Sequence, residues 1–255
     1  MAKTITCRTI IPMKQINEKT LEANAPAPDL PLTKEEVATA AKKRLSLIHK
    51  EFAEAFTFIS KYPKSVSFFG SARLKENNIH YIKAAGLSQK LAKLGYTIVT
   101  GGGPGIMEAA NRGAFEAGGQ SVGLNIKLSR EQRTNKYLTD KHDFYYFFVR
   151  KVALSFAAEA YIFFPGGFGT LDEFFEIITL IQTKKIAPVP VVLVGLDYWG
   201  ALDAFIRKEL SSRHHAISKG DLDLYTVLDD DDEILKAVTA SEVVVTPPLH
   251  NGQEA

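Results

Sequence analysis

The sequence predicts an α/β protein: a doubly wound parallel sheet with helices on both faces, preceded by an N-terminal helical extension. From Lys64 onward, short apolar runs alternate with segments in which apolar residues recur every three or four positions. Glycine-rich stretches stand where some of the short runs give way to helical segments. Because parallel strands need helical crossovers, this alternation favours a Rossmann-like sheet covered on both faces.

The extension is expected over residues 1–62. Residues 1–31 contain ANAPAPDLP and no sustained periodicity, which favours a flexible start. A long amphipathic helix is expected over 33–60, because Thr33 and Glu36 form a capping-box pattern at its start. Its apolar stripe comprises Val37, Ala41, Leu45, Ile48, Phe52, Phe56 and Ile59. We expect this stripe to contact the main domain or to extend a subunit interface.

The main domain is expected over 63–245, followed by a flexible tail at 246–255. Strands are expected over 66–70, 96–100, 121–126, 143–147, 161–164, 189–194 and 224–228. Helices are expected over 78–94, 105–117, 149–158, 170–184 and 198–210, with a polar loop at 127–141 and a further helix start at 229–232. Ligands bind at the carboxyl ends of strands in such sheets, so the segments after Gly70, Thr100 and Phe164 are the candidate binding loops.

Composition narrows the class of protein. The 255 residues, of which 45% are hydrophobic and 24% charged, suit one large domain with a smaller appendage. The single cysteine, Cys7, excludes an intramolecular disulfide and a cysteine-rich metal site. No run approaches the roughly 20 apolar residues of a membrane span, and a secretory signal is not seen, so a soluble, cytoplasmic protein is expected. A net charge of +2 does not favour a nucleic-acid partner.

The first glycine-rich loop, GGGPGIME at 101–108, follows an expected strand and precedes an expected helix. Gly102 and Gly103 would let backbone amides approach an anion, with Pro104 in the first helical turn. The loop fits neither a dinucleotide fingerprint nor a Walker loop, because Ile106 stands where each requires glycine. A tight turn without a ligand is the alternative.

The second loop, FFPGGFGTLDE at 163–173, has the same strand-to-helix placement. Its glycines would leave amides at a helix start free for a phosphate, and Thr170 would add a hydroxyl. The alternative is a capping box, in which Glu173 folds back onto Thr170. Two glycine-rich strand ends in one sheet favour a cleft over two independent turns.

These motifs resemble those of a known family. GGGPGIMEAANRGA at 101–114, Arg150-Lys151 and PGGFGTLDE at 165–173 together resemble the Lonely Guy family of cytokinin-activating phosphoribohydrolases, often labelled possible lysine decarboxylases. The resemblance covers residues 64–210, and an arginine fifteen residues before the proline of PGGxGTxxE makes it specific. Nothing singles out a lysine as a Schiff-base site for pyridoxal phosphate, so the residues do not support a decarboxylase.

The resemblance implies an N-glycosidase that cleaves purine nucleoside 5′-monophosphates to a free base and ribose 5-phosphate, without metal or organic cofactor. Arg150 and Glu173 match the catalytic residues. The matching substrate-binding and phosphate-binding residues are Gly167, Phe168, Gly169, Thr170, Lys151, Glu131 and Thr179. Gly102, Gly103 and Ser71 are further candidates from the other two loops. The expected partners are a nucleoside monophosphate and other copies of the chain, with neither nucleic acid nor membrane.

Several features keep alternatives open. Molybdenum-cofactor carriers share the expected fold and its phosphate cradle without hydrolysis, whereas the enzyme needs both Arg150 and Glu173. Glu108 has a simpler explanation in helix-dipole electrostatics, and His214-His215 reads as a surface pair rather than a metal site. Two secondary candidates are Arg73, as a cleft residue, and the aromatic run 144–148. The sequence departs from the family pattern at two places: phenylalanines stand where short members have a histidine before Arg150, and Asp172 stands where glutamate is frequent.

Overall fold

The structure, a computed structural model, describes residues 34–127 and 134–240. The chain divides into two compact units, Met1–Ser46 and Leu47–Ala255. The first helix, α1 (Lys34–Ile59), begins in the first unit and ends in the second. The capping box expected from Thr33 and Glu36, the flexible start and the tail lie outside the described residues.

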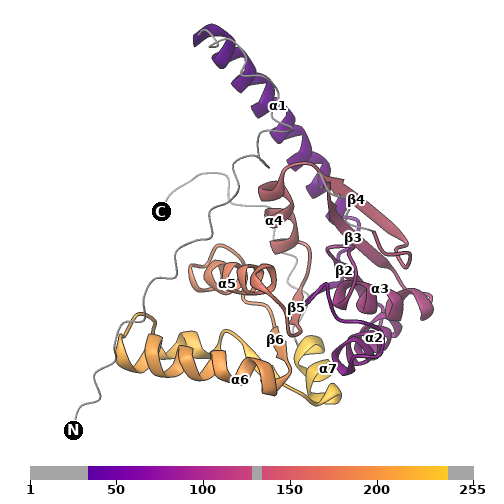
Figure 1. The fold of residues 1–255 in the computed structure, drawn as a ribbon, viewed down its shortest axis with the longest axis vertical. Coiled ribbons are helices and arrows are strands. Elements are labelled where there is room, and N and C mark those ends of the chain that lie inside the picture. The colour runs from indigo at the N-terminus through magenta and orange to yellow at the C-terminus, as the bar shows by residue number, and fades with distance from the viewer. Residues whose placement is uncertain (1–33, 128–133, 241–255) are drawn as a thin grey trace, which may run out of the picture. The chain divides into compact units, whose positions relative to one another are not determined.

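The second unit is built on a sheet of seven strands, all parallel, in the order β4-β3-β2-β1-β5-β6-β7 (Figure 1). This arrangement confirms the predicted α/β class with a parallel sheet. The strands are β1 (Ser65–Phe69), β2 (Thr97–Thr100), β3 (Ser121–Ile126), β4 (Asp140–Phe144), β5 (Ala160–Phe163), β6 (Val191–Val194) and β7 (Thr226–Leu228). Strands such as β5 (AYIF) and β6 (VVLV) are buried along their whole length, which explains why they appear as continuous apolar runs.

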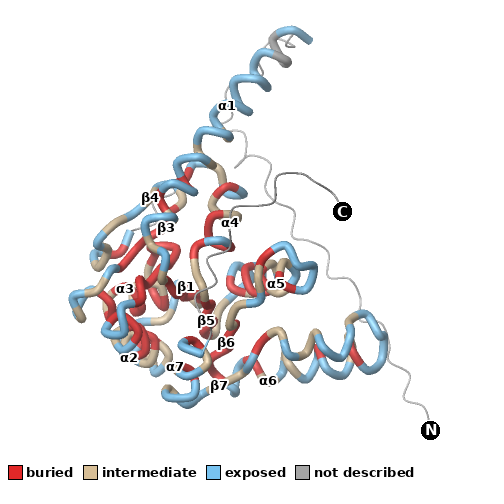
Figure 2. The backbone as a smooth tube through the Cα atoms, turned by 180° about the vertical axis from the view of Figure 1, so that it is seen from behind, coloured by how far each residue is buried: buried red, intermediate tan, exposed pale blue. Residues whose placement is uncertain are grey.

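Helices cover both faces of the sheet (Figures 1 and 2). They are α2 (Ile79–Lys93), α3 (Ile106–Glu116), α4 (Phe147–Ser155), α5 (Phe168–Gln182), α6 (Leu196–Phe205) and α7 (Asp231–Thr239). One face packs against α4, α5, α6 and the second half of α1, and the other packs against α2, α3 and α7. Neighbouring residues of β1 alternate between these cores, since Phe68 belongs to one and Phe69 to the other.

Some boundaries differ from the sequence-based expectation. The strand expected over 143–147 is Asp140–Phe144, and the chain already enters α4 at Phe147. β4 is an edge strand whose residues are mostly part-exposed or exposed, so its sequence, DKHDF, has the polarity of a loop. α6 continues directly into a π-helix, Ile206–Arg213, where one longer α-helix to residue 210 was expected.

The strand order reverses beside β1. The chain moves outward from β1 to β4 and then returns to place β5 on the other side of β1. The loops that follow β1 and β5 are consequently neighbours, and the Ser71 N–H donates a 2.9 Å hydrogen bond to the Pro165 carbonyl. Such a reversal is where open α/β sheets bind ligands. Among the described residues no helix is both long and apolar enough to cross a membrane.

Candidate active site

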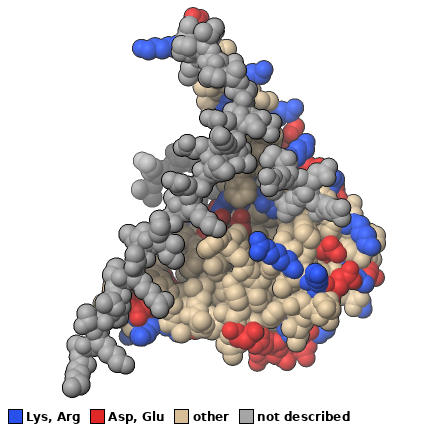
Figure 3. Space-filling model, viewed as in Figure 1, with Lys and Arg blue, Asp and Glu red and all other residues tan. Residues whose placement is uncertain are grey.

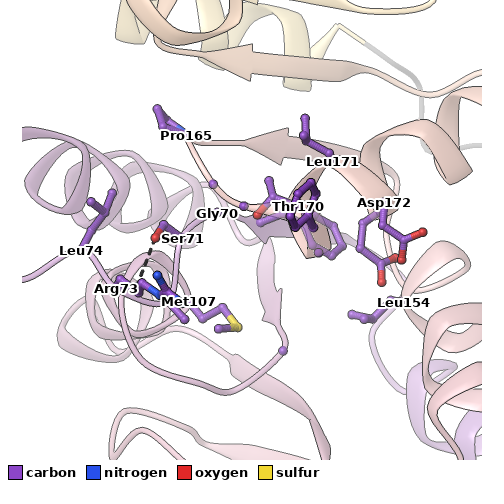
Figure 4. Close-up of a pocket in the computed structure, with 18 of the residues that line it drawn as sticks. Gly70, Ser71, Arg73, Leu74, Met107, Leu154, Pro165, Thr170, Leu171 and Asp172 are labelled. Carbon is purple, nitrogen blue, oxygen red and sulfur yellow. Dashed lines mark hydrogen bonds between the residues drawn. The ribbon is translucent and has the colours of Figure 1, made fainter. Parts of the chain in front are cut away.

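A cavity of about 910 Å³ lies at this reversal, at the carboxyl ends of β1, β2 and β5 (Figure 4). Figure 4 shows Ser71, Arg73 and Met107 on one side of it and Asp172 on the other. Its lining comprises residues 69–74, Gly101, Met107, Phe147, Arg150, Leu154, residues 165–173 and Tyr198. The structure therefore brings the second glycine-rich loop together with Arg150 and Ser71.

Glu173 is buried in the wall of this cavity and is only 6% exposed. Its Oε2 accepts no hydrogen bond from any residue that the structure describes. Burial raises the pKa of Glu173 to about 7; Glu176 adds to the rise, while Lys151 and Arg150 oppose it. A carboxyl group of this kind exchanges protons near neutral pH, which suits it to acid–base chemistry.

The capping box expected from Thr170 and Glu173 is not formed. α5 begins two residues earlier than expected, with Gly167 as its N-cap residue and no side-chain cap. Thr170 is therefore inside the first turn, where its amide bonds to the Gly167 carbonyl. Because Glu173 is one turn too far along to cap the helix, its burial at the cavity has no such local structural explanation.

Arg150, on α4, enters the cavity from the opposite helix. Its Nε donates a 2.7 Å hydrogen bond to the carbonyl of Leu124, in the second half of β3. Burial lowers the pKa of Arg150 and the charge of Glu173 opposes this, but a guanidinium remains cationic at neutral pH. Gly101 makes room for it, since a Cβ at that position would lie 2.3 Å from Arg150 Nη2.

The turn before α5 presents backbone amides. The N–H groups of Gly167, Phe168 and Gly169 donate to no acceptor within the described parts of the chain. Two hydrogen bonds fix the turn from outside: Ser71 N–H to Pro165, and the Tyr198 hydroxyl to the Gly166 carbonyl at 2.6 Å. Free amides at the start of a fifteen-residue helix form a favourable place for an anion.

Among the described residues, the first glycine-rich loop reaches the cavity with only one of its glycines. Gly101 lines the cavity, whereas Gly102 and Gly103 are buried outside its lining. Their carbonyls accept hydrogen bonds from the backbone and side-chain amides of Asn135. Gly102 also has a φ of 70°, and a Cβ there would lie 1.6 Å from Asn125 Oδ1.

A buried polar network holds this loop. Asn111 accepts from the Thr100 hydroxyl at 2.6 Å and from the Asn135 side-chain amide at 2.9 Å, and it donates to Ser121. The Thr100 hydroxyl in turn accepts from the Gly102 amide. The first turn of α3 begins only at Ile106, after Gly105 with a φ of 71°, so Pro104 precedes the helix it was expected to start.

Lys151 and Thr179 do not line the main cavity. Both border a neighbouring cavity of about 750 Å³ on the outer side of α5. Lys151 pairs with Asp172 and with Glu176, the latter at 2.8 Å. Burial alone would lower the pKa of Lys151, but these contacts outweigh it and raise that pKa. The Thr179 hydroxyl donates to the Phe175 carbonyl of its own helix.

The remaining candidates are spread more widely. Ser71 lines the cavity, and its Oγ also accepts a 3.2 Å hydrogen bond from Arg73 N–H, as a local turn would require. Glu108 accepts from the Tyr81 hydroxyl and is not among the cavity residues. Glu131 lies outside the described residues. His214 and His215 are exposed, and no metal-ligand cluster occurs within residues 34–127 and 134–240.

Sequence reasoning missed the residues that support the site from behind. Asn111 stands within the quoted motif GGGPGIMEAANRGA, but nothing in a single sequence marks it as buried. Asn135 and Tyr198 follow no motif, and their contacts join segments far apart in the chain. An asparagine before a strand carries no local signal of such a role, so only the fold reveals these residues.

Comparison with known proteins decides the family. A family model described as possible lysine decarboxylase matches residues 107–238, which include Arg150 and Glu173. The chain belongs to the Lonely Guy family. The predicted resemblance is thereby confirmed.

Plant relatives of this Lonely Guy protein carry names that state an activity. A probable cytokinin riboside 5′-monophosphate phosphoribohydrolase of Oryza sativa subsp. japonica is 34% identical over 153 residues, which are 58% of this chain and 61% of that protein. A cytokinin riboside 5′-monophosphate phosphoribohydrolase of Arabidopsis thaliana is 30% identical over 152 residues, covering 58% of this chain and 70% of the relative. The similarity thus spans about three fifths of the rice protein's length.

Solved structures show the same fold. A molybdenum cofactor binding protein from Rippkaea orientalis superimposes with a TM-score of 0.52 at 20% identity, over 69% of this chain and 96% of that one. A molybdenum cofactor carrier protein from Chlamydomonas reinhardtii gives a TM-score of 0.51 at 23% identity, over 69% and 97% of the two chains. At this level of identity the likeness extends to the fold alone.

Proposed function

We propose that this Lonely Guy protein hydrolyses the N-glycosidic bond of purine nucleoside 5′-monophosphates, releasing the free base and ribose 5-phosphate. The observation that most supports this is Glu173, a buried carboxyl group whose Oε2 has no hydrogen-bond donor among the described residues. It shares one cavity with the Arg150 guanidinium and the uncapped start of α5. A burial this costly is typical of a functional rather than a structural carboxylate.

The 5′-phosphate would bind at the start of α5. The amides of Gly167, Phe168 and Gly169 are without acceptors in the described structure, and the helix dipole favours negative charge there. Thr170 lines the same part of the cavity and would contribute its hydroxyl. On the face drawn in Figure 3, basic side chains are interspersed with acidic ones, which is consistent with a small anionic ligand rather than a long polyanion.

The bond would break through an oxocarbenium-like state of the ribose. In its ionised form Glu173 would accept a proton from the attacking water, stabilise the positive charge on the sugar and orient its hydroxyl groups. Water adds at C1′, the bond from C1′ to the base nitrogen breaks, the base nitrogen takes up a proton from solvent, and Glu173 releases to solvent the proton that it accepted. Arg150 would hold the substrate and balance the carboxylate from the opposite helix.

The base would occupy the apolar part of the cavity. Apolar side chains line the cavity on both sides, with Leu74 and Met107 on one side and Leu154 on the other, and such side chains suit the flat surface of a purine. The volume of about 910 Å³ accommodates a nucleotide. We therefore propose AMP or a cytokinin riboside 5′-monophosphate as the substrate.

We also propose that the chain forms homo-oligomers through the outer faces of α4 and α5. These helices expose three phenylalanine side chains that make none of the contacts with α1: Phe147, Phe168 and Phe175. Phe168 is 92% exposed, an unusual environment for a phenylalanine in a free monomer. Sedimentation at working concentration is expected to show a dimer or a larger species, and a strictly monomeric particle would contradict the proposal.

A panel of nucleoside 5′-monophosphates tests the reaction. The purified protein is incubated with each nucleotide, and free base and ribose 5-phosphate are measured by chromatography. We expect equal amounts of both products from at least one purine nucleotide and none from Glu173→Gln. Nucleotide binding without release of any base would instead favour a non-hydrolytic binding or carrier protein of this fold.

A further inference from the structure

The second half of α1 contacts the segment that leads into α4. The carboxylate of Glu51 accepts two hydrogen bonds, from the Tyr145 N–H at 2.7 Å and the Tyr146 N–H at 2.9 Å. Glu51 and both tyrosines belong to the unit Leu47–Ala255. A single side chain of the N-terminal helix therefore binds the amide of Tyr146, the N-cap residue of the helix that holds Arg150, and the amide of the residue before it.

α4 has no cap of its own. Its N-cap residue, Tyr146, makes no side-chain cap hydrogen bond, and no acidic residue lies in its first turn. The first amides of a helix need acceptors, and negative charge there is favourable. Glu51 supplies an acceptor and a charge from a different helix, at a position where α4 supplies neither.

Aromatic contacts extend along the same pair of helices. The rings of Phe52 and Phe148 lie 6.3 Å apart near the start of α4. The rings of Phe56 and Phe156 lie 5.9 Å apart at its C-cap. Both ends of this nine-residue helix are thus in contact with α1.

One backbone hydrogen bond links this support to the cavity. The Tyr146 amide is bound by Glu51, and the Tyr146 carbonyl accepts a 3.2 Å hydrogen bond from the Arg150 amide. Arg150 then contacts Leu124 and lies close to Gly101, so its position depends on the placement of α4. The path from Glu51 to the guanidinium contains a single intervening residue.

We propose that Glu51 is a positioning residue for the reaction: by fixing the N-cap residue of α4 and the residue before it, it holds Arg150 in its place in the cavity. The N-terminal helix then contributes to the active site, although none of its residues whose side chains the structure describes lines the cavity. This inference rests on the proposed function for the role of Arg150. It does not depend on which purine nucleotide is the substrate.

Glu51→Gln tests the inference, because glutamine keeps the length of the side chain but has one acceptor oxygen and no charge. We expect kcat to fall about tenfold to a hundredfold and substrate binding to weaken as well, since Arg150 also holds the substrate and a small displacement of a catalytic group has effects of this size. Glu54→Gln is the matched control, because Glu54 is exposed on the same helix and pairs only with Lys50, at 3.7 Å, among the described residues. An unchanged kcat in Glu51→Gln would overturn the inference.

A double-mutant cycle separates positioning from general loss of stability. Glu51→Gln is combined with Arg150→Lys, and assays are run well below the melting temperature of each variant. We expect Glu51→Gln to have little further effect on kcat when Arg150 is already replaced. An undiminished effect in that background would contradict positioning through Arg150.

The inference remains testable if the wild-type chain hydrolyses none of the nucleotides. Calorimetric titration with AMP then replaces turnover, because Arg150 lines the cavity in either case. Weaker AMP binding by Glu51→Gln, with wild-type binding by Glu54→Gln, would support the positioning role while the proposed reaction failed. Equal affinities in all three proteins would overturn the role itself.

Discussion

Glu173 on α5 and Arg150 on α4 line one cavity, and each changes the ionisation of the other. Burial raises the pKa of the carboxyl group and lowers that of the guanidinium, while their mutual attraction opposes both changes. The result is a carboxyl group with a pKa of about 7 beside a permanent cation. Both protonation states of Glu173 are thus populated near neutral pH.

The first prediction concerns stability. The pKa of Glu173 in the folded protein is raised from 4.5 to about 7. The contribution of Glu173 to the free energy of unfolding is therefore fully present below about pH 4.5 and is lost as pH rises through 7. Glu173→Gln stays neutral and avoids that loss, which amounts to about 3 kcal/mol for this displacement of the pKa. Urea unfolding should show equal stability of the two proteins at low pH and a more stable variant at pH 8. Parallel pH dependences would contradict the prediction.

The second prediction concerns rate. If ionised Glu173 is the base, kcat/KM should rise with pH and level off above about 7. The nucleotide phosphate has its own pKa of about 6, so nucleotide binding by inactive Glu173→Gln is measured over the same range to separate the two titrations. A rate that does not change from pH 5.5 to pH 8 would rule out Glu173 as the base.

The third prediction concerns a residue that supports Arg150. In Gly101→Ala the new Cβ would lie 2.3 Å from Arg150 Nη2 and 2.9 Å from Met107 Sδ, so the guanidinium must move. We expect kcat to fall about tenfold or more. Gly86→Ala is the control, because a Cβ within α2 meets nothing within 4 Å and should leave kcat unchanged. Wild-type turnover in Gly101→Ala would show that the position of Arg150 is unimportant.

The fourth prediction concerns the phosphate turn. Tyr198→Phe removes the hydroxyl that fixes the Gly166 carbonyl, and we expect ribose 5-phosphate to bind about threefold to tenfold more weakly. Tyr161→Phe removes an equivalent 2.6 Å bond, to the Ser155 carbonyl, and neither of these two residues lines the cavity. It should lower the melting temperature without changing that affinity. Equal weakening in both variants would indicate a general effect on folding.

The sequence was sufficient to predict the architecture because local hydrophobic patterns indicate most of its strands and helices. Fully buried strands appear as apolar runs, and the alternation with helices leaves few other topologies. The edge strand β4 was misplaced because an exposed strand needs no apolar pattern, and its position is set by pairing of Asp140 with Val122 on β3.

The candidate site was predictable only where residue type itself suggests chemistry. Arg150, Glu173 and the glycines before α5 stand out in the sequence, and all line the cavity. Gly102 has a positive φ, and in the sequence a glycine required for that conformation looks the same as one required for ligand approach. The hydrogen bonds of Asn135 and Glu51 join segments that are far apart in the sequence, so no local sequence pattern predicts a role for these two residues.

The position of β5 beside β1 also determines when the cavity can form during synthesis. β1 and β2 leave the ribosome in close succession, but the second neighbour of β1 emerges only after β3, β4 and α4. Until Ala160 reaches Val66, one edge of the central strand has no partner and the phosphate turn has not been made. A nascent chain of this protein therefore leaves one edge of β1 unpaired until β5 has been made.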